Sequence, residues 1–261
     1  MLNIVIPMAG RGSRFADAGY AFPKPLIDIN GETMIEVVVR NLKPKVDHRF
    51  IFICQREHYE KYDLYNILKR STNNKFEVVL INGITEGAAC TVLCAKQYIN
   101  NSDPMVIANS DQYIEPRINK FIADAYNKDL DGSIMTFHSS HPKWSYARLD
   151  TEGRVVEVAE KKVISEHATV GIYYFKHGED FVRGAESMIH RNIRHNNEFY
   201  VCPVYNDLIL EDKNIGIYPI TAEVMHGLGT PEDLKLFLRK LDACQVDCSI
   251  TATIKEEAET V

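Results

Sequence analysis

The chain has 261 residues, 45% hydrophobic and 25% charged, which is ordinary for a globular protein with a sizeable core. The formal net charge of −6 excludes a global basic field that would draw the chain to nucleic acid or to anionic lipid. No apolar run approaches the roughly 20 residues of a membrane span. The start of the chain also lacks the pattern of a signal peptide, so we expect a cytoplasmic protein.

Short β-branched or apolar runs alternate with helical patterns in the first half of the chain. The predicted strands are Asn3–Met8, Arg49–Cys54, Phe76–Ile81, Met105–Ala108 and Ser133–His138. The predicted helices are Thr33–Leu42, His58–Lys69, Ala88–Tyr98 and Arg117–Asn127. This alternation predicts an α/β fold with a doubly wound, mainly parallel, Rossmann-like mixed sheet. Ligands of such sheets collect at the carboxyl ends of the strands.

The second half of the chain changes character and contains fewer helical patterns. Its predicted strands are Ala147–Asp150 and Arg154–Glu157, which flank a turn with the sequence TEG, followed by Thr169–Phe175 and Ile215–Ile220. Its predicted helices are Phe181–Arg191 and Pro231–Leu241, the latter preceded by Thr230 as the N-cap. We find no internal repeat and no proline-rich linker, which favours a single domain.

The chain has six cysteines, which could form a zinc site or could be reduced thiols without a metal. They are Cys54, Cys90, Cys94, Cys202, Cys244 and Cys248. Two pairs are spaced by four residues, which on a helix would place both thiols on one face. However, Cys-x-x-Cys spacing and an accompanying histidine pair are both absent, so we interpret the cysteines as buried reduced thiols.

The stretch IVIPMAGRGSRFADAGYAFPKPLI (Ile4–Ile27) combines flexible backbone with positive charge directly after the first strand. Gly10 and Gly12 allow backbone N–H groups to approach a phosphate closely. Arg11 and Arg14 can grip phosphate oxygens, and Lys24 stands between two prolines that present it stiffly. This combination suits a nucleoside triphosphate. The alternative is an ordinary glycine turn with solvated arginines, since the stretch matches neither common nucleotide-binding glycine motif.

Here the sequence resembles a known family. MAGRGSRF…PKPLI is similar to the signature of the nucleotidylyltransferases that activate sugar 1-phosphates and related phosphates. Further segments follow in the order of that family: EGAACT (Glu86–Thr91), IANSDQYI (Ile107–Ile114), VAEK (Val158–Lys161), ATVGIYYF (Ala168–Phe175) and GLGTPEDL (Gly227–Leu234). They cover residues 3 to about 238. The pattern looks most like the branch found in bacterial capsule and surface-polysaccharide gene sets.

The resemblance implies transfer of a nucleoside monophosphate from a nucleoside triphosphate to a small phosphorylated acceptor, such as a sugar 1-phosphate, with release of pyrophosphate. CTP or UTP is favoured by analogy with relatives in surface-glycan pathways. The resemblance also implies one domain over residues 1–245, with a nucleotide-binding half of about 1–140 and an acceptor-binding lid of about 141–245. A polar tail, 246–261, would follow it. Oligomeric state stays open, although the family often forms dimers or tetramers.

The site residues are carried over from the matching motifs. The catalytic residues implied are Arg14 and Lys24. The nucleotide-binding residues implied are Met8, Ala9, Gly10, Arg11, Gly12, Gly87, Ala88 and Asp111. Asp111 would also hold Mg²⁺ at the end of its strand. The acceptor-binding residues expected are Glu160, Lys161, Gly171, Glu198 and Tyr200, the last two from the amide- and tyrosine-rich segment Asn196–Ile209.

Structural alternatives stay open for these residues. Asp111 could make a turn after a strand, Glu160 and Lys161 could be a charged strand end, and Gly171 could mark a plain bulge. The segment Asn196–Ile209 could be an aromatic-anchored loop over the sheet. Trp144 could stack on a ligand or pack under the lid.

The chain departs from the family pattern at two positions. Gly227 stands where much of the family has the aspartate that serves as the second metal carboxylate, and Lys162 replaces the proline after the Glu-Lys pair. Glu198 is a candidate to supply the missing carboxylate. The departure at Gly227 keeps a non-catalytic nucleotide-binding regulator open as an alternative.

A second alternative is a glycosyltransferase. Such enzymes need an Asp-x-Asp element, which DLDG (Asp129–Gly132) matches by letters. We interpret DLDG as a turn before a strand instead.

Overall fold

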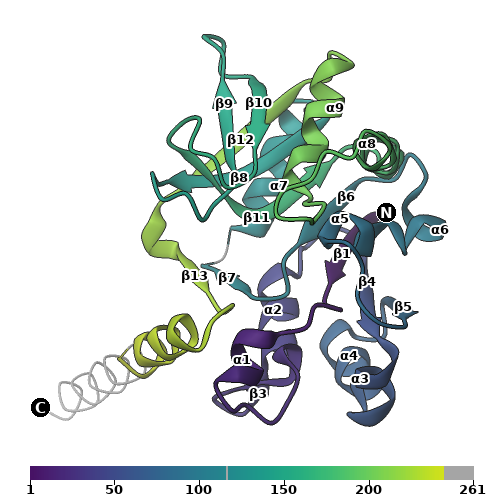
Figure 1. The fold of residues 1–261 in the computed structure, drawn as a ribbon, viewed down its shortest axis with the longest axis vertical. Helices are drawn as coiled ribbons and strands as arrows, with labels where there is room; N and C mark the ends of the chain where they lie inside the picture. The colour runs from purple at the N-terminus through teal and green to yellow at the C-terminus, as the bar shows by residue number, and fades with distance from the viewer. Residues whose placement is uncertain (116, 244–261) are drawn as a thin grey trace, which may run out of the picture.

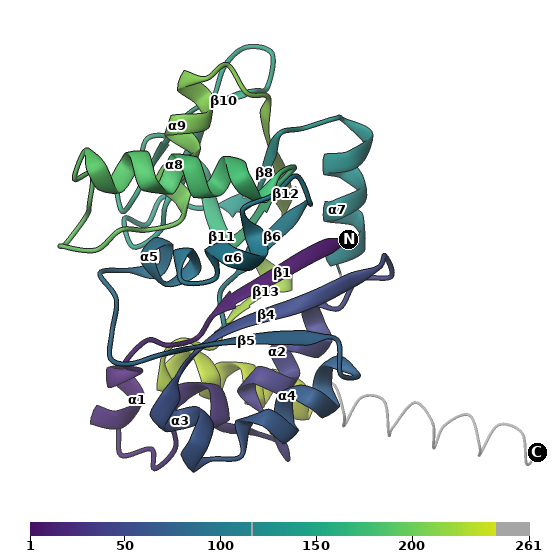
Figure 2. The same cartoon turned by 90° about the vertical axis from the view of Figure 1, so that its right-hand side faces the viewer.

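The computed structural model describes residues 1–115 and 117–243. Over these residues a nine-stranded sheet forms the centre of the molecule, with helices on both of its faces (Figures 1 and 2). The predicted tail, 246–261, and the cysteines Cys244 and Cys248 lie outside the described residues.

The strands of the central sheet are β1 (Leu2–Pro7), β4 (His48–Gln55), β5 (Phe76–Ile81), β6 (Met105–Ala108), β8 (Gly132–His138), β9 (Tyr146–Leu149), β10 (Val155–Ala159), β11 (His167–Phe175) and β12 (Ile215–Ile220). They follow the order β10-β9-β11-β6-β1-β4-β5, with β8 pairing with β11 and with β12. The strands β6, β1, β4 and β5 run parallel, and β11 joins them antiparallel to β6. The predicted α/β class with a largely parallel central sheet is confirmed. The second half of the chain adds antiparallel pairing, including the hairpin β9–β10 around the predicted TEG turn.

The helices are α1 (Ser13–Asp17), α2 (Met34–Leu42), α3 (Arg56–Lys61), α4 (Leu64–Thr72), α5 (Ala88–Leu93), α6 (Lys96–Ile99), α7 (Ile118–Asn127), α8 (Gly178–His190) and α9 (Tyr205–Leu210), with a last helix over residues 231–243. Short 3-10 turns are Lys24–Leu26, Cys202–Val204 and Ala222–Val224. Two small sheets stand apart from the central one: β2 (Asp28–Ile29) with β3 (Glu32–Thr33), and β7 (Gln112–Ile114) with β13 (Met225–Gly227).

Two predictions of one continuous helix are wrong, because each of these segments forms two helices in the structure. The predicted helix His58–Lys69 divides into α3 and α4 because Asp63 takes a left-handed backbone with φ of 49°. The predicted helix Ala88–Tyr98 divides into α5 and α6 at Ala95, whose backbone leaves the helical region. Apolar spacing did not reveal the second break, because buried residues occur on both sides of it, in α5 and in α6.

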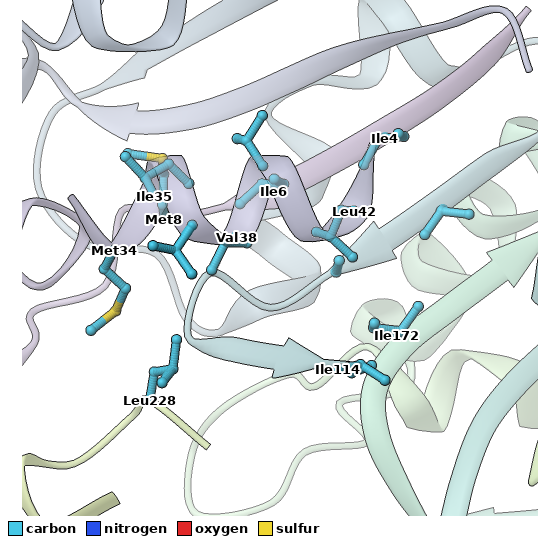
Figure 3. Close-up of a cluster of buried hydrophobic side chains, with 14 of the residues drawn as sticks. Ile4, Ile6, Met8, Met34, Ile35, Val38, Leu42, Ile114, Ile172 and Leu228 are labelled. Atoms are coloured by element: carbon cyan, nitrogen blue, oxygen red, sulfur yellow. The ribbon is translucent and has the colours of Figure 1, made fainter. Parts of the chain in front are cut away.

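Two layers of apolar side chains enclose the central sheet. Side chains alternate along a strand, so Ile4 and Ile6 point to one face while Val5 points to the other. The first layer includes α2, α4 and α7, and Figure 3 shows Ile4, Ile6 and Val38 within it. The second layer includes α5, α6, α8 and α9. This double cover fixes the carboxyl ends of β1 and β6, where the predicted site residues lie.

Candidate active site

The loop after β1 turns sharply at Gly12. Gly12 has φ of 62° and ψ of 27° and begins α1, whose Phe15 is buried in the core. A Cβ on Gly12 would lie 3.2 Å from the Cβ of Lys24, so glycine here allows the two segments to pack closely. The exposed residues Arg11 and Arg14 stand on either side of this turn.

Lys24 is presented by the stiff segment that the two prolines predict. Pro23 precedes the 3-10 turn Lys24–Leu26, in which Pro25 and Leu26 are buried. The Lys24 Nζ lies 2.9 Å from Oδ2 of Asp111, and both side chains keep about a fifth of their surface exposed. Lys24, in the 3-10 turn after α1, therefore pairs with the carboxylate that follows β6.

A third segment, from near the end of the described chain, completes this junction. The Leu228 backbone N–H donates to the Asp111 carbonyl oxygen at 2.7 Å. A Cβ on Gly229 would lie 2.7 Å from the Asp111 carboxylate, so the Gly-Thr segment passes directly against it. Gly229 was missed as a site residue, although the matching Gly-Thr-Pro-Glu-Asp motif is the signal that could have indicated it.

A cavity of about 690 Å³ lies over this junction. Among the predicted residues, its wall contains Ala9, Gly10, Arg11, Gly12, Arg14, Lys24, Gly87, Ala88, Asp111 and Glu198. Met8 is absent from this wall, because its side chain is 4% exposed and packs in the core beneath the loop. The cavity is large enough for a nucleoside triphosphate, and its polar wall fits an anionic ligand.

Gly87 brings the far wall of this cavity against the segment after α8. A Cβ on Gly87, whose φ is 128°, would lie 2.4 Å from the carbonyl oxygen of Phe199. Two backbone hydrogen bonds join the segments, from Phe199 to Glu86 at 2.7 Å and from Ala89 to Phe199 at 3.0 Å. Arg194 adds an ion pair with Glu86 at 2.8 Å and stacks over the Phe199 ring. The Glu86–Ala89 segment and the Asn196–Tyr200 segment thus form one wall.

A second cavity, of about 310 Å³, adjoins the first. Arg14 and Ala88 line both cavities. Four of the predicted acceptor residues line the second cavity: Glu160, Lys161, Gly171 and Tyr200. Glu198 instead lines the first cavity and a neighbouring hollow that it shares with Glu160 and Tyr200. The structure thus brings four of the five acceptor residues to one cavity, beside the cavity over the glycine loop.

Each of the two charged groups Glu160 and Lys161 of the second cavity is bonded to a neutral hydroxyl. The Glu160 carboxylate accepts a hydrogen bond from the Ser145 hydroxyl, and burial raises the pKa of Glu160. The Lys161 Nζ donates to the Tyr200 hydroxyl at 2.8 Å. Burial, assisted by Glu198, raises the pKa of the Tyr200 phenol, so this hydroxyl is neutral at physiological pH. The cavity therefore offers a cation, a carboxylate and a neutral hydroxyl.

Several lining residues of the second cavity were not predicted. They are Asn109, Gln112, Lys143, Ser145, Thr169, Val170, Tyr173, Val201 and Cys202, together with Trp144, for which the sequence leaves two roles open. Trp144 packs edge-on against Phe137 and also faces this cavity. The signal for Asn109 and Gln112 was their position within the matching IANSDQYI segment.

The donor set at Asp111 fits Mg²⁺ only with help from substrate. Within residues 1–115 and 117–243, no three His, Cys, Asp or Glu side chains gather around a common point. Mg²⁺ often takes one or two carboxylates and completes its shell with water and substrate phosphates, which a single Asp111 permits. The carboxylate near position 227 is that of Asp233, which would lie 3.5 Å from a Cβ on Gly227. This carboxylate already accepts a hydrogen bond from the Thr230 hydroxyl.

The Asp-x-Asp element and the cysteines do not join the site. Asp129 pairs with Lys176 at 2.7 Å, and Asp131 accepts from the Asn214 backbone, so DLDG is the turn before β8 that the sequence predicts. Cys54 and Cys202 are buried as expected, and burial raises the pKa of Cys54 to about 12. The expectation is wrong for Cys94, which is exposed at the end of α5.

The chain belongs to the nucleotidyl transferase family of enzymes, whose model matches residues 4–200. The fold is similar to that of the nucleoside-diphosphate-sugar pyrophosphorylase from Vibrio cholerae RC9, with 26% identity and a TM-score of 0.78 over 90% of this chain and 99% of the other. It is also similar to a UDP-glucose pyrophosphorylase complexed with UDP-glucose, with 16% identity and a TM-score of 0.74 over 93% and 99% of the two chains.

Two curated relatives are the bifunctional proteins GlmU of Methanocaldococcus jannaschii and Methanococcus aeolicus, with 25% and 24% identity over 67% of this chain. Each match spans 40% of the relative's length, so the chain corresponds to less than half of these proteins.

Within the described residues, no helix is both long and apolar enough to cross a bilayer.

Proposed function

We propose that this chain transfers a nucleoside monophosphate from CTP or UTP to a small phosphorylated acceptor, such as a sugar 1-phosphate, and releases pyrophosphate. The observation that carries the proposal is the larger cavity over Lys24, Asp111 and the glycine loop, which adjoins the smaller cavity at Arg14 and Ala88. Family membership supports the reaction class. The pyrophosphorylases of similar fold support a nucleotide sugar as product.

The reaction needs positioning and charge neutralisation more than a protein nucleophile. An acceptor phosphate oxygen attacks the α-phosphorus, forming a new P–O bond, while the bond from that phosphorus to the bridging oxygen breaks and pyrophosphate leaves. The nucleotide would lie in the larger cavity with its phosphates on the loop of Gly10 and Gly12. The acceptor would lie in the smaller cavity, with its phosphate between Lys161 and Arg14.

Arg14 is the residue best placed to serve both substrates. Its side chain lines both cavities, so its guanidinium can neutralise the acceptor phosphate and the α-phosphate as they approach. Lys24 would leave Asp111 and bind the triphosphate. Asp111 would then hold Mg²⁺, which supplies charge neutralisation at the phosphates when bound.

The capsule or surface-glycan role and a cytoplasmic location are further parts of this proposal. The motif pattern supports the capsule or surface-glycan role by analogy.

The test is a pyrophosphate-release screen that crosses four nucleoside triphosphates with a panel of sugar, polyol and amino-alcohol phosphates. We expect pyrophosphate with one pyrimidine nucleotide and one acceptor together, and none when either is omitted. Nucleotide binding without pyrophosphate release from any pair would favour a regulatory protein instead.

A further inference from the structure

Two asparagine side chains each bond both backbone groups of one buried strand residue close to the site. The Ile114 N–H donates to Oδ1 of Asn41 at 2.9 Å, and Nδ2 of Asn41 donates to the Ile114 carbonyl oxygen. The Val158 N–H donates to Oδ1 of Asn206, and Nδ2 of Asn206 donates to the Val158 carbonyl oxygen, both at 2.9 Å. Ile114 and Val158 are 3% and 2% exposed, so their backbone groups need a partner within the protein. Each asparagine therefore takes the place of a neighbouring strand.

Asn41 bonds the edge of β7 that faces away from β13. On the β13 side, the Leu228 N–H donates to the Asp111 carbonyl oxygen at 2.7 Å. Backbone groups alternate between the two edges of a strand, so those of Ile114, three positions after Asp111, face the other edge. Asn41 binds them there. The short strand after the carboxylate that pairs with Lys24 is thus bonded on both of its edges.

The helix that carries Asn41 also supports Lys24. α2 packs against the 3-10 turn that begins at Lys24, and the first N–H of α2 donates to the Ile27 carbonyl oxygen just after that turn, at 2.8 Å. Asn41 is the second-last residue of α2 and bonds β7. One helix therefore contacts the elements of both partners in the pair between Lys24 and Asp111. Without the bonds of Asn41, β7 could move relative to the turn of Lys24.

Asn206 has the corresponding place beside β10, the last strand at its end of the central sheet. Val158 lies three residues before Lys161, whose φ of 50° is a left-handed conformation that strains a lysine backbone. Such a residue keeps its conformation where the surrounding structure fixes it, and Asn206 fixes the strand that leads into it. α9, which carries Asn206, lies beside β10 (Figure 1). The hydroxyl of Tyr205 on α9 donates to the Tyr174 carbonyl oxygen at 2.8 Å, which anchors this helix in the core.

We propose that Asn41 and Asn206 are positioning residues, one for each substrate. Asn41 fixes Asp111 for the nucleotide and its Mg²⁺, and Asn206 fixes Lys161 for the acceptor phosphate. This inference rests on the proposed function. Neither asparagine lines the 690 Å³ or the 310 Å³ cavity, so each acts through the strand that it bonds. Their helices, α2 and α9, belong to different layers over the sheet, so the loss of one asparagine should affect one substrate.

The first test measures binding without turnover in Asn41→Leu and Asn206→Leu. Leucine has about the size of asparagine but no hydrogen-bonding atom. The probes are glucose 1-phosphate and, with Mg²⁺, a CTP or UTP analogue with a methylene group between the α- and β-phosphorus, and calorimetry gives each Kd. We expect Asn41→Leu to raise the Kd of the analogue about tenfold and to leave that of glucose 1-phosphate unchanged. Asn206→Leu should do the opposite.

Asn119→Leu is the matched control for a lost bond between a side chain and the backbone. Asn119, on α7, accepts a hydrogen bond from the Lys45 N–H at 2.7 Å and lines neither cavity. Both Kd values of this variant should equal those of the wild type. If a leucine variant does not fold, the alanine variant at the same position takes its place, because it leaves room for water on the freed backbone groups.

The second test measures the same selectivity in turnover, with a pair of substrates that releases pyrophosphate. We expect Asn41→Leu to raise the nucleotide KM and the Mg²⁺ concentration for half-maximal rate about tenfold, with the acceptor KM unchanged. Asn206→Leu should raise the acceptor KM by a similar factor and leave the other two values unchanged. A general loosening of the fold would not divide the effects between the substrates in this way.

The outcomes separate this inference from the reaction itself. If pyrophosphate is released and both variants keep wild-type KM values, or each raises both values alike, the positioning roles are rejected and the proposed function stands. If no pair reacts, the reaction is rejected and the Kd values decide, since opposite selectivity in the two variants supports the positioning roles. Where the wild type neither reacts nor binds the analogue, the role of Asn41 is rejected. Where it neither reacts nor binds glucose 1-phosphate, the role of Asn206 is rejected.

Discussion

The pair between Lys24 and Asp111 shows how single side chains prepare the site for an anionic ligand. Each group neutralises the other across 2.9 Å, and neither is fully desolvated. A partly exposed pair of this kind is worth little to stability, so it can open when a stronger partner arrives. A triphosphate offers Lys24 several charged oxygens at once. The pair is therefore suited to exchange partners on nucleotide binding.

Replacing either Arg14 or Lys24 should stop the reaction without unfolding the protein. We expect Lys24→Ala and Arg14→Ala each to lower kcat about 100-fold or more, as removal of a charge-stabilising group does in other enzymes. The measurements are pyrophosphate release and the melting temperature. Lys120→Ala, an exposed lysine on α7, is the control. Wild-type rates in either loop variant would reject its assigned role.

The raised pKa of Glu160 predicts a pH dependence of acceptor binding. Burial raises this pKa above the ordinary 4.5, and Glu198 adds to the effect, while Ser145 and Lys161 oppose it. The ionised carboxylate accepts hydrogen bonds more strongly, so the acceptor KM should fall as pH rises through the raised pKa. In Glu160→Gln that slope should disappear, with a KM about tenfold higher at pH 7. A slope that persists in the variant would assign the titration to another group.

The same shift sets the direction of the stability change. The folded state holds the Glu160 proton to a higher pH than the unfolded chain, so ionisation of Glu160 lowers the free energy of unfolding as pH rises above 4.5. Glu160→Gln should therefore gain stability relative to the wild type over that window. Urea unfolding at several pH values measures the difference.

The residues that sequence could not assign are those defined by contacts between distant segments. The motifs indicated Lys24, Asp111 and Gly87, because each stands in a short pattern with its own chemistry. Nothing in the pattern distinguishes Met8, which packs inward, from its neighbour Ala9, which lines the cavity. The close approach of Gln112 to Gly171 joins positions 59 apart in the chain and is visible only once β11 lies beside β6.

At the scale of elements, the most specific feature is the contact of the Glu86–Ala89 segment with Phe199. This contact joins the wall of the larger cavity to the chain that leads into Tyr200 of the smaller one. Displacing it should disturb both substrate sites together. A glycine at position 87 is what permits the approach.

Gly87→Ala tests this contact against a matched control. Gly87 has φ of 128° and no room for a Cβ, whereas Gly153, in the β9–β10 turn, has φ of 82° with nothing within 4 Å of a Cβ. We expect Gly153→Ala to cost about 1–2 kcal/mol of unfolding free energy from backbone strain alone. Gly87→Ala should cost more and should raise the KM of both substrates. Equal costs, with substrate KM values unchanged, would show that the close approach to Phe199 is unimportant.

Strands were easier to predict than the short elements between them. Phe76–Ile81, Met105–Ala108 and Ile215–Ile220 were predicted to the residue, since all three are short runs rich in β-branched and apolar residues. In contrast, α1, β7 and β13 have three to five residues, too few for a period to emerge. These short elements carry much of the site, so the site was less predictable than the fold.

At the scale of the whole molecule, the sheet brings together segments that are remote in sequence. Lys24, in the 3-10 turn after α1, and Gly229, in the segment after β13, both lie against the carboxylate of Asp111, which follows β6. The two cavities then open on either side of Arg14. Under the proposed function, this arrangement would place both substrates beside Arg14. In the part of the chain that the structure describes, no group of three or more metal-ligating side chains accompanies Asp111 at this junction.

Because the protein offers few metal ligands beside Asp111, we predict that Mg²⁺ binds together with the nucleotide and binds the nucleotide-free protein only weakly. We expect EDTA to abolish pyrophosphate release yet to leave the melting temperature of the nucleotide-free protein unchanged. CTP or UTP at 100 times its Kd, with Mg²⁺, should stabilise the protein by about 2.7 kcal/mol, a rise of about 5–10 °C for a chain of this size. Omitting Mg²⁺, or changing Asp111 to Asn, should remove most of that rise. A nucleotide-free protein that melts earlier in EDTA would instead indicate a resident metal, and full stabilisation of Asp111→Asn by the Mg²⁺ nucleotide would exclude Asp111 as its ligand.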